Sequence, residues 1–265
     1  MILTVDGREA FAYTGGRPFD PALPCVVFVH GAVCDHSVFT LLARWCAHHG
    51  HGVLAVDLPG HMRSAGPALA SVEAMAEELL ALLDAAGVQQ AAFVGHSLGS
   101  LVALEAAARA PQRATRLVMI GTCVPMPVPQ ALLDLSLADP PAAVDRVVGF
   151  SFSTLAAKPS YPGPGVWLRG ATRALMRQVL AVGEPRLFHT DFAACHAYSG
   201  GLDAAARVAC PAHLVLGAQD QMALPRNAKA VAQALQATVH TLPGGHFPMQ
   251  EQPDATLAVL RRALA

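Results

Sequence analysis

The chain has little charge and no long run of charge of one sign. Charged residues make up 14% of its 265 residues, and the formal net charge is −1. A nucleic-acid-binding surface requires clustered Lys and Arg, so this class of partner is excluded. Because 53% of the residues are hydrophobic, the chain can bury a sizeable core, which also excludes extended disorder.

An uninterrupted apolar segment is missing too, although the mean hydropathy is +0.40. The most apolar stretch, residues 117–133, is broken by one glycine and three prolines. A spanning helix needs about 20 apolar residues without such breaks. The opening residues MILTVDGR show neither a basic leader nor a long apolar run, so no secretory signal is expected. We expect a soluble, cytoplasmic protein with no membrane partner.

The six cysteines form no C-x-x-C pair; they are Cys25, Cys34, Cys46, Cys123, Cys195 and Cys210. This spacing argues against a zinc module and, in a reducing compartment, against a disulfide framework. We interpret them as small buried hydrophobic residues. His189, Asp191, Cys195 and His196 could imitate a metal-ligand set, but no other pattern supports one. We therefore expect no metal and no cofactor.

Strand and helix patterns alternate along most of the chain. Residues 2–5 and 9–13 flank the turn Asp6-Gly7 and predict an opening hairpin. Apolar runs predict buried strands over residues 25–29, 52–56, 91–94, 116–120, 213–216 and 238–242. Helical periodicity predicts helices over residues 39–48, 72–86, 98–110, 225–235 and 253–264. This alternation predicts an α/β fold with a doubly wound, mostly parallel sheet of eight strands.

The alternation breaks between residues 125 and 201. This stretch has helical patterns joined by Pro-rich and Gly-rich segments, such as residues 158–165. We interpret it as an inserted helical cap. The predicted organisation is a core of residues 1–124 and 202–265 with a cap of residues 125–201.

Gly95-His96-Ser97-Leu98-Gly99 lies between a predicted strand and a predicted helix. That context is the one in which G-x-S-x-G forms a sharp turn that exposes the serine hydroxyl above a sheet. The N-terminus of the following helix favours negative charge. Ser97 is therefore the candidate nucleophile, against the alternative of an ordinary turn. His96 is expected to pack beside the turn, since adjacent residues there point apart.

A serine nucleophile of this kind requires two donors for a developing oxyanion. His30-Gly31-Ala32-Val33 follows the predicted strand of residues 25–29, and its glycine allows close approach to Ser97. We assign the donors to the backbone N–H groups of Ala32 and Leu98, with Val33 as the fallback. His30 is expected to hold the loop by hydrogen bonding.

The serine also needs a histidine base and an orienting acid. Ligands in such sheets meet at the carboxyl ends of the strands. His246 follows the predicted strand of residues 238–242, and Asp220 follows the strand before it. The order Ser97, Asp220, His246 is the expected one. The other position for an acid, after the strand ending at Ile120, offers no carboxylate.

With these motifs in hand, the chain resembles the α/β-hydrolase superfamily over almost its full length. The matching motifs, in order, are His30-Gly31, residues 57–61 (DLPGH), residues 95–99, residues 217–220 (GAQD) and Gly245-His246. Residues 245–253 look like the signature of the esterase, enol-lactonase and cofactor-free haloperoxidase-like groups. Two positions depart from the pattern, because Met62 and Ser100 stand where glycine is common.

The residues and the resemblance together predict a serine hydrolase. It would cleave a small to medium, largely apolar carboxylic ester or lactone as its small-molecule partner; no pattern indicates an oligomeric state. Alternatives that use the same triad are a C–C bond hydrolase, a perhydrolase and a lyase, and a slow-turnover ligand-binding protein is a further one. Candidate pocket residues are Val33, Met62, Phe247 and Trp167. Arg169, Arg173 and Arg177 either hold a substrate carboxylate or form a solvated face.

Overall fold

A computed structural model describes residues 1–265. One sheet of eight strands has the order β1-β2-β4-β3-β5-β6-β7-β8. Its strands are β1 (Ile2–Val5), β2 (Arg8–Tyr13), β3 (Cys25–Val29), β4 (Gly52–Val56), β5 (Ala91–His96), β6 (Ala114–Ile120), β7 (Ala212–Gly217) and β8 (Thr238–Leu242). Only β2 runs antiparallel to its neighbours β1 and β4, and the other pairs are parallel. The predicted mostly parallel, eight-stranded sheet is confirmed.

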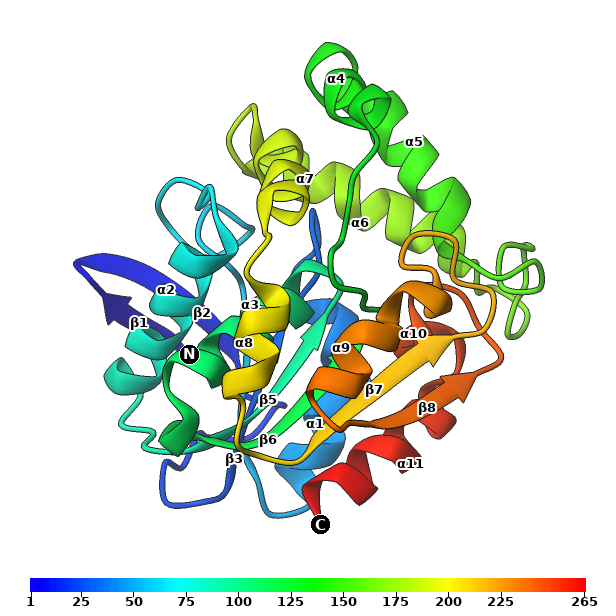
Figure 1. Ribbon diagram of the computed structural model, residues 1–265. Helices are drawn as coiled ribbons and strands as arrows, with labels where there is room; N and C mark the ends of the chain where they lie inside the picture. The colour runs from blue at the N-terminus through cyan, green and yellow to red at the C-terminus, as the bar shows by residue number, and fades with distance from the viewer.

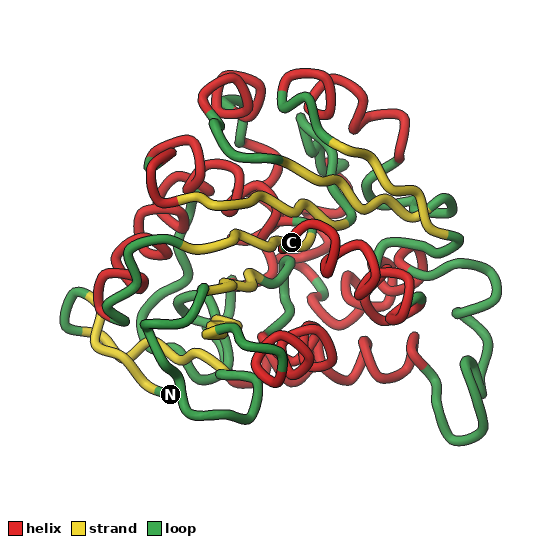
Figure 2. Tube along the Cα trace, turned by 90° about the horizontal axis from the view of Figure 1, so that it is seen from below, coloured by secondary structure: helices red, strands yellow, loops and turns green.

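Helices cover both faces of the sheet (Figure 1, Figure 2). One face carries α1 (Thr40–His48), which follows the 3₁₀ turn His36–Phe39, and α11 (Pro253–Leu264). The other face carries α2 (Val72–Ala85), α3 (Leu98–Arg109), α8 (Gly201–Arg207) and α9 (Lys229–Ala234), each in contact with the next. Short 3₁₀ turns, Pro111–Arg113 and Pro225–Ala228, precede β6 and α9. Covered on both faces, β3 and β4 are buried at every residue, as their unbroken apolar sequences require.

Four of the five helices between β6 and β7 lie above the carboxyl ends of the strands, at the top of Figure 1. They are α4 (Gln130–Ala138), α5 (Pro140–Ser151), α6 (Leu168–Val182) and α7 (Leu187–Ala197), and we call them the cap helices. Their buried apolar side chains, such as Val144 and Phe188, belong to the same hydrophobic cluster as the sheet. The cap helices are therefore packed firmly over the carboxyl edge. The division of the chain at residues 124 and 202 stays a prediction.

A local signal explains where α2 begins. Ser71 caps α2, because its hydroxyl accepts a hydrogen bond, 3.1 Å long, from the Ala74 N–H. The short helix α10 (Pro248–Glu251), which directly follows His246 and Phe247, was not predicted. None of the helices has both the length and the apolarity required to cross a bilayer.

Candidate active site

Ser97 sits at the turn between β5 and α3 with a strained backbone. Its φ of 52° and ψ of −120° lie in a region that non-glycine residues rarely adopt. A Cβ atom at Gly95 would collide with the Gly99 carbonyl, and one at Gly99 would collide with the Val29 carbonyl. The two glycines therefore allow the sharp turn, which leaves the Ser97 side chain half-buried and facing a cavity.

Asp220 and His246 form a hydrogen-bonded pair next to this cavity. His246 Nδ1 donates to Asp220 Oδ2 over 2.8 Å, and both residues are buried. The second carboxylate oxygen, Oδ1, accepts the N–H groups of Met222 and Ala223 at 2.8 and 2.9 Å. The hydrogen bond to Asp220 favours the tautomer with its proton on Nδ1, in which the lone pair of His246 Nε2 can accept a proton.

Two glycines let the His246 loop approach its neighbours. A side chain at Gly217, the last residue of β7, would collide with the Gly245 carbonyl. A side chain at Gly121, just after β6, would come within 2.8 Å of the His246 carbonyl oxygen. The alternative position for the acid therefore does face His246, but it is occupied by glycine.

His96 does more than pack beside the turn. Its Nε2 lies 2.8 Å from the His246 carbonyl oxygen and donates to it, because a carbonyl can only accept. Burial lowers the pKa of His96 well below its usual value, and the neighbouring His246 adds to this shift, so its ring is neutral. His96 thus joins the Ser97 turn to the His246 loop. Sequence reasoning missed this link because the residues are 150 positions apart.

The loop after β3 brings Ala32 to the cavity. Both Gly31 and Ala32 line it, and a Cβ atom at Gly31 would lie 3.0 Å from the Ser97 Cβ. The Ala32 N–H has no acceptor within the chain. The Leu98 N–H is the first of α3, where helical donors lack intrahelical partners. Both predicted donors are thus available.

The N–H group considered as the fallback donor already has an acceptor. The Val33 N–H donates to Asp191 Oδ2 over 2.8 Å, and the Val33 side chain is fully buried. His30 holds this loop as expected: its Nε2 accepts the Leu58 N–H at 3.0 Å, so its Nδ1 donates to the Gly31 carbonyl oxygen at 2.8 Å.

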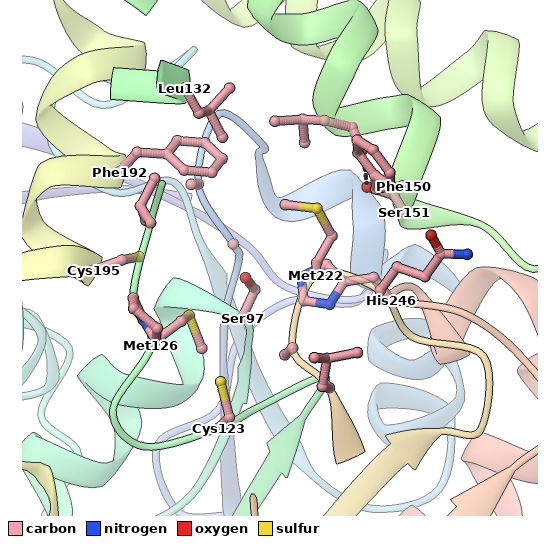
Figure 3. A pocket seen from close by; sticks show the side chains of 18 of the residues that line it. Ser97, Cys123, Met126, Leu132, Phe150, Ser151, Phe192, Cys195, Met222 and His246 are labelled. Carbon is pink, nitrogen blue, oxygen red and sulfur yellow. Dashed lines mark hydrogen bonds between the residues drawn. The ribbon is translucent and has the colours of Figure 1, made fainter. Parts of the chain in front are cut away.

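The cavity has a volume of about 380 Å³ and lies between the sheet edge and the cap helices. Figure 3 shows Ser97 and His246 pointing into it, with Met222 beside the imidazole. The cap side contributes apolar side chains and one exposed cation: Met126, Val128, Leu132, Arg146, Val147, Phe150, Met176 and Phe192. Of its 24 lining residues, 14 are hydrophobic, so a bound molecule would meet mainly apolar surface.

Of the four candidate pocket residues, only Phe247 lines the cavity. Val33 is buried behind the Ala32 loop. Met62 has a left-handed φ of 40°, so the turn keeps the backbone that glycine would favour, and its half-buried side chain packs on the core instead. Trp167 is 42% exposed at the start of α6, and its indole N–H donates to the Ala157 carbonyl oxygen. Single-residue positions within the cap could not be inferred from periodicity.

Two further groups of polar side chains pair among themselves. Arg173 and Arg177 pair with Asp145 on α5, so they form an ion-paired face and not part of the cavity wall. Asp35, His36 and Asp57 lie close enough to share an ion. However, Asp57 accepts from both His36 N and His36 Nδ1, at 2.9 and 2.7 Å, which fixes the loop after β4.

Comparison with known proteins agrees with this architecture. A family model described as the alpha/beta hydrolase fold matches residues 24–253. The enol-lactonase from Burkholderia xenovorans LB400 superposes with a TM-score of 0.85 at 21% identity, over 100% of this chain and 99% of that chain. At this identity the likeness shows the fold alone.

Curated relatives match over shorter stretches. The sn-1-specific diacylglycerol lipase ABHD11 of Mus musculus is 36% identical over 102 residues, which are 38% of this chain and 33% of the relative. Esterase YbfF of Escherichia coli is 33% identical over 95 residues, 36% of this chain and 37% of the relative. The match thus spans about a third of these relatives' length. Because the family model covers most of its length, the chain belongs to the alpha/beta hydrolase fold family.

Proposed function

We propose that the chain is a serine hydrolase that cleaves a small to medium, largely apolar carboxylic ester or lactone. One observation carries the proposal. Ser97 and His246 both line a cavity whose lining is mostly apolar, and Asp220 is hydrogen-bonded to His246 behind it. The similar proteins support it, since their names are those of an enol-lactonase, a diacylglycerol lipase and an esterase.

In the proposed mechanism Ser97 Oγ attacks the carbonyl carbon while His246 Nε2 takes its proton. Asp220 stabilises the resulting imidazolium through the Nδ1 hydrogen bond. The N–H groups of Ala32 and Leu98 hold the oxyanion of the tetrahedral intermediate. His246 then gives the proton to the leaving alcohol oxygen as the C–O bond breaks. Water, activated by His246 in the same way, attacks the acyl-enzyme and releases the acid and Ser97.

The test is a panel of aryl esters, lactones and vinylogous diketones assayed with wild type and Ser97→Ala. We expect turnover of esters or lactones that Ser97→Ala abolishes. Ester turnover retained by Ser97→Ala would refute the proposal.

The same panel, together with a halogenation assay and a binding measurement, separates the rival chemistries. Cleavage of the diketones alone would identify a C–C bond hydrolase. Peroxide-dependent halogenation in acetate would identify a perhydrolase. Tight, saturable binding with very slow acyl release would identify a ligand-binding protein. All six cysteines are free thiols and five are buried, which supports the further proposal of a reducing, cytoplasmic location.

A further inference from the structure

A buried carboxylate from the cap helices reaches the loop that carries the Ala32 amide. Asp191, on α7, has no exposed surface, and its Oδ2 accepts the Val33 N–H at 2.8 Å. The same oxygen lies 3.0 Å from Nε2 of His61, which is also buried. One oxygen atom therefore joins three segments: the loop after β3, the loop after β4 and a cap helix.

The hydrogen bonds on either side of Ala32 fix its amide direction. The Gly31 carbonyl accepts from His30 Nδ1 at 2.8 Å and from the Cys34 N–H at 3.2 Å. Because a trans peptide is planar, this carbonyl fixes the opposite direction for the Ala32 N–H of the same peptide. The next peptide is fixed at its other end, where the Val33 N–H donates to Asp191.

Val33 makes that second contact necessary. Its φ is 55°, in the left-handed region, which a β-branched side chain rarely adopts. Such a conformation persists only where its surroundings hold it. Asp191 is the acceptor that holds it, and the acceptor comes from the cap helices instead of from the sheet.

The charge of Asp191 is balanced. An uncompensated carboxylate one residue behind an oxyanion donor would repel the charge that develops there. Burial disfavours the charged form of His61, but the attraction of Asp191, the hydrogen bond between them and the Pro59 carbonyl raise its pKa above the usual value. Both ring nitrogens of His61 face acceptors, Nε2 the Asp191 carboxylate at 3.0 Å and Nδ1 the Pro59 carbonyl oxygen at 3.1 Å. A ring that donates from both nitrogens carries a positive charge, which opposes the charge of the carboxylate.

We propose that Asp191, paired with His61, is a positioning residue for the oxyanion hole. The cap helices thereby influence the rate of turnover through the Val33 N–H. Asp191 does not line the cavity, so this influence does not depend on contact with the substrate. The inference rests on the proposed function, because it takes the Ala32 N–H as an oxyanion donor.

The experiment compares three variants on an aryl ester that the wild type turns over. Asp191→Ala removes the acceptor. Asp191→Asn keeps a carbonyl oxygen for the Val33 N–H. Glu184→Ala is the matched control. Glu184 lies between α6 and α7, and its carboxylate also accepts a backbone N–H, that of Ala68 at 3.2 Å, but outside the Ala32 loop.

For Asp191→Ala we expect kcat to fall roughly ten- to a hundredfold, somewhat less than the loss of a whole oxyanion donor. KM should change by less than about twofold, because substrate contacts stay in place. The affinity for phenylboronic acid, whose tetrahedral adduct places an oxygen in the hole, should fall by the same factor as kcat. Asp191→Asn should recover most of both losses, whereas a purely structural role would lower thermal stability without this joint change.

Equal kcat values for Asp191→Ala and Glu184→Ala would overturn the inference, as would an effect confined to KM. If the alanine variant does not fold, Asp191→Ser replaces it, because its hydroxyl is too short to reach the Val33 N–H. Ser97→Ala is assayed in parallel. A dead Ser97→Ala with an unaffected Asp191→Ala refutes only the positioning role, while an active Ser97→Ala refutes the proposed function itself.

Discussion

The two loops that flank Ser97 are each held by a buried carboxylate, but in different ways. On the oxyanion side, Asp191 reaches down from a cap helix to the Val33 N–H of a core loop. On the base side, Glu251 of α10 lies in the core and reaches up. Its Oε1 accepts the Gly245 N–H at 2.8 Å, and its Oε2 accepts the Ser153 N–H, just beyond α5, at 3.2 Å.

The two carboxylates differ in whether a cationic group lies next to them. Asp191 has the His61 imidazole against it, whereas Glu251 has no cationic partner. Burial raises the pKa of Glu251, the charge of Asp220 adds to the shift, and the hydrogen bonds from Gly245 and Ser153 only oppose it in part. The comparison teaches that an N–H acceptor near a forming oxyanion needs its charge cancelled. The acceptor on the base side has no such partner, and its raised pKa shows that burial and Asp220 disfavour its charged form.

The largest expected effect is on the base side itself. Asp220→Asn removes the negative charge that stabilises the imidazolium and disturbs the tautomer that leaves Nε2 of His246 free. We expect kcat to fall about 10⁴-fold, as for such a change in other triads. Steady-state kinetics on the preferred ester measures it. Asp145→Asn, at a partly exposed acid that pairs with Arg173 and Arg177, is the control and should keep full activity. A loss below tenfold would contradict the role of Asp220.

The next largest effect is expected for the carboxylate on the base side, Glu251. Glu251→Ala leaves the Gly245 and Ser153 N–H groups buried without an acceptor, which should lower the free energy of unfolding by roughly 2–4 kcal/mol. Because Gly245 precedes His246, kcat should also fall, roughly tenfold, through misplacement of the base. Urea unfolding and kinetics measure both. Glu77→Ala, at an exposed carboxylate paired with Arg109, should cost less than about 1 kcal/mol. Equal losses in the two variants would show that Glu251 does not hold the loop.

Much of this architecture could be predicted because its signals are local. The strands β3, β4 and β8 and the helix α11 have the ranges expected from apolar runs and periodicity. Ser97, Asp220 and His246 each follow a strand, so one rule about strand ends predicts their meeting. Their catalytic roles stay predictions that the kinetics above will test.

The residues that hold the site could not be predicted, because their contacts join distant parts of the chain. Asp191 and His61 are 130 positions apart, and Ser153 and Glu251 are 98 apart. The local sequence of α7 does not show which residues Asp191 contacts. The one available signal was the position of Asp191 among apolar neighbours such as Phe188, Phe192 and Ala194, where an unpaired carboxylate would be costly.

The smallest expected effect is a difference in pH dependence between the two sides. The raised pKa of His61 means that its contribution to stability is fully present below its unfolded pKa, near 6.5, and is lost as the pH rises through its folded value. The stability advantage of wild type over Asp191→Asn should therefore shrink as the pH rises above about 6.5.

For Glu251, the contribution to stability changes over a more acidic pH range. Its contribution is present below the unfolded value, near 4.5, and is lost as the pH rises through the folded value. The stability of wild type relative to Glu251→Gln should therefore fall as the pH rises above about 4.5 and through the folded value of Glu251. Urea unfolding of the three proteins from pH 4 to 9 measures both windows. An advantage over Asp191→Asn that grows with pH would contradict the ion pair, because only a protonated His61 stabilises the Asp191 carboxylate by charge.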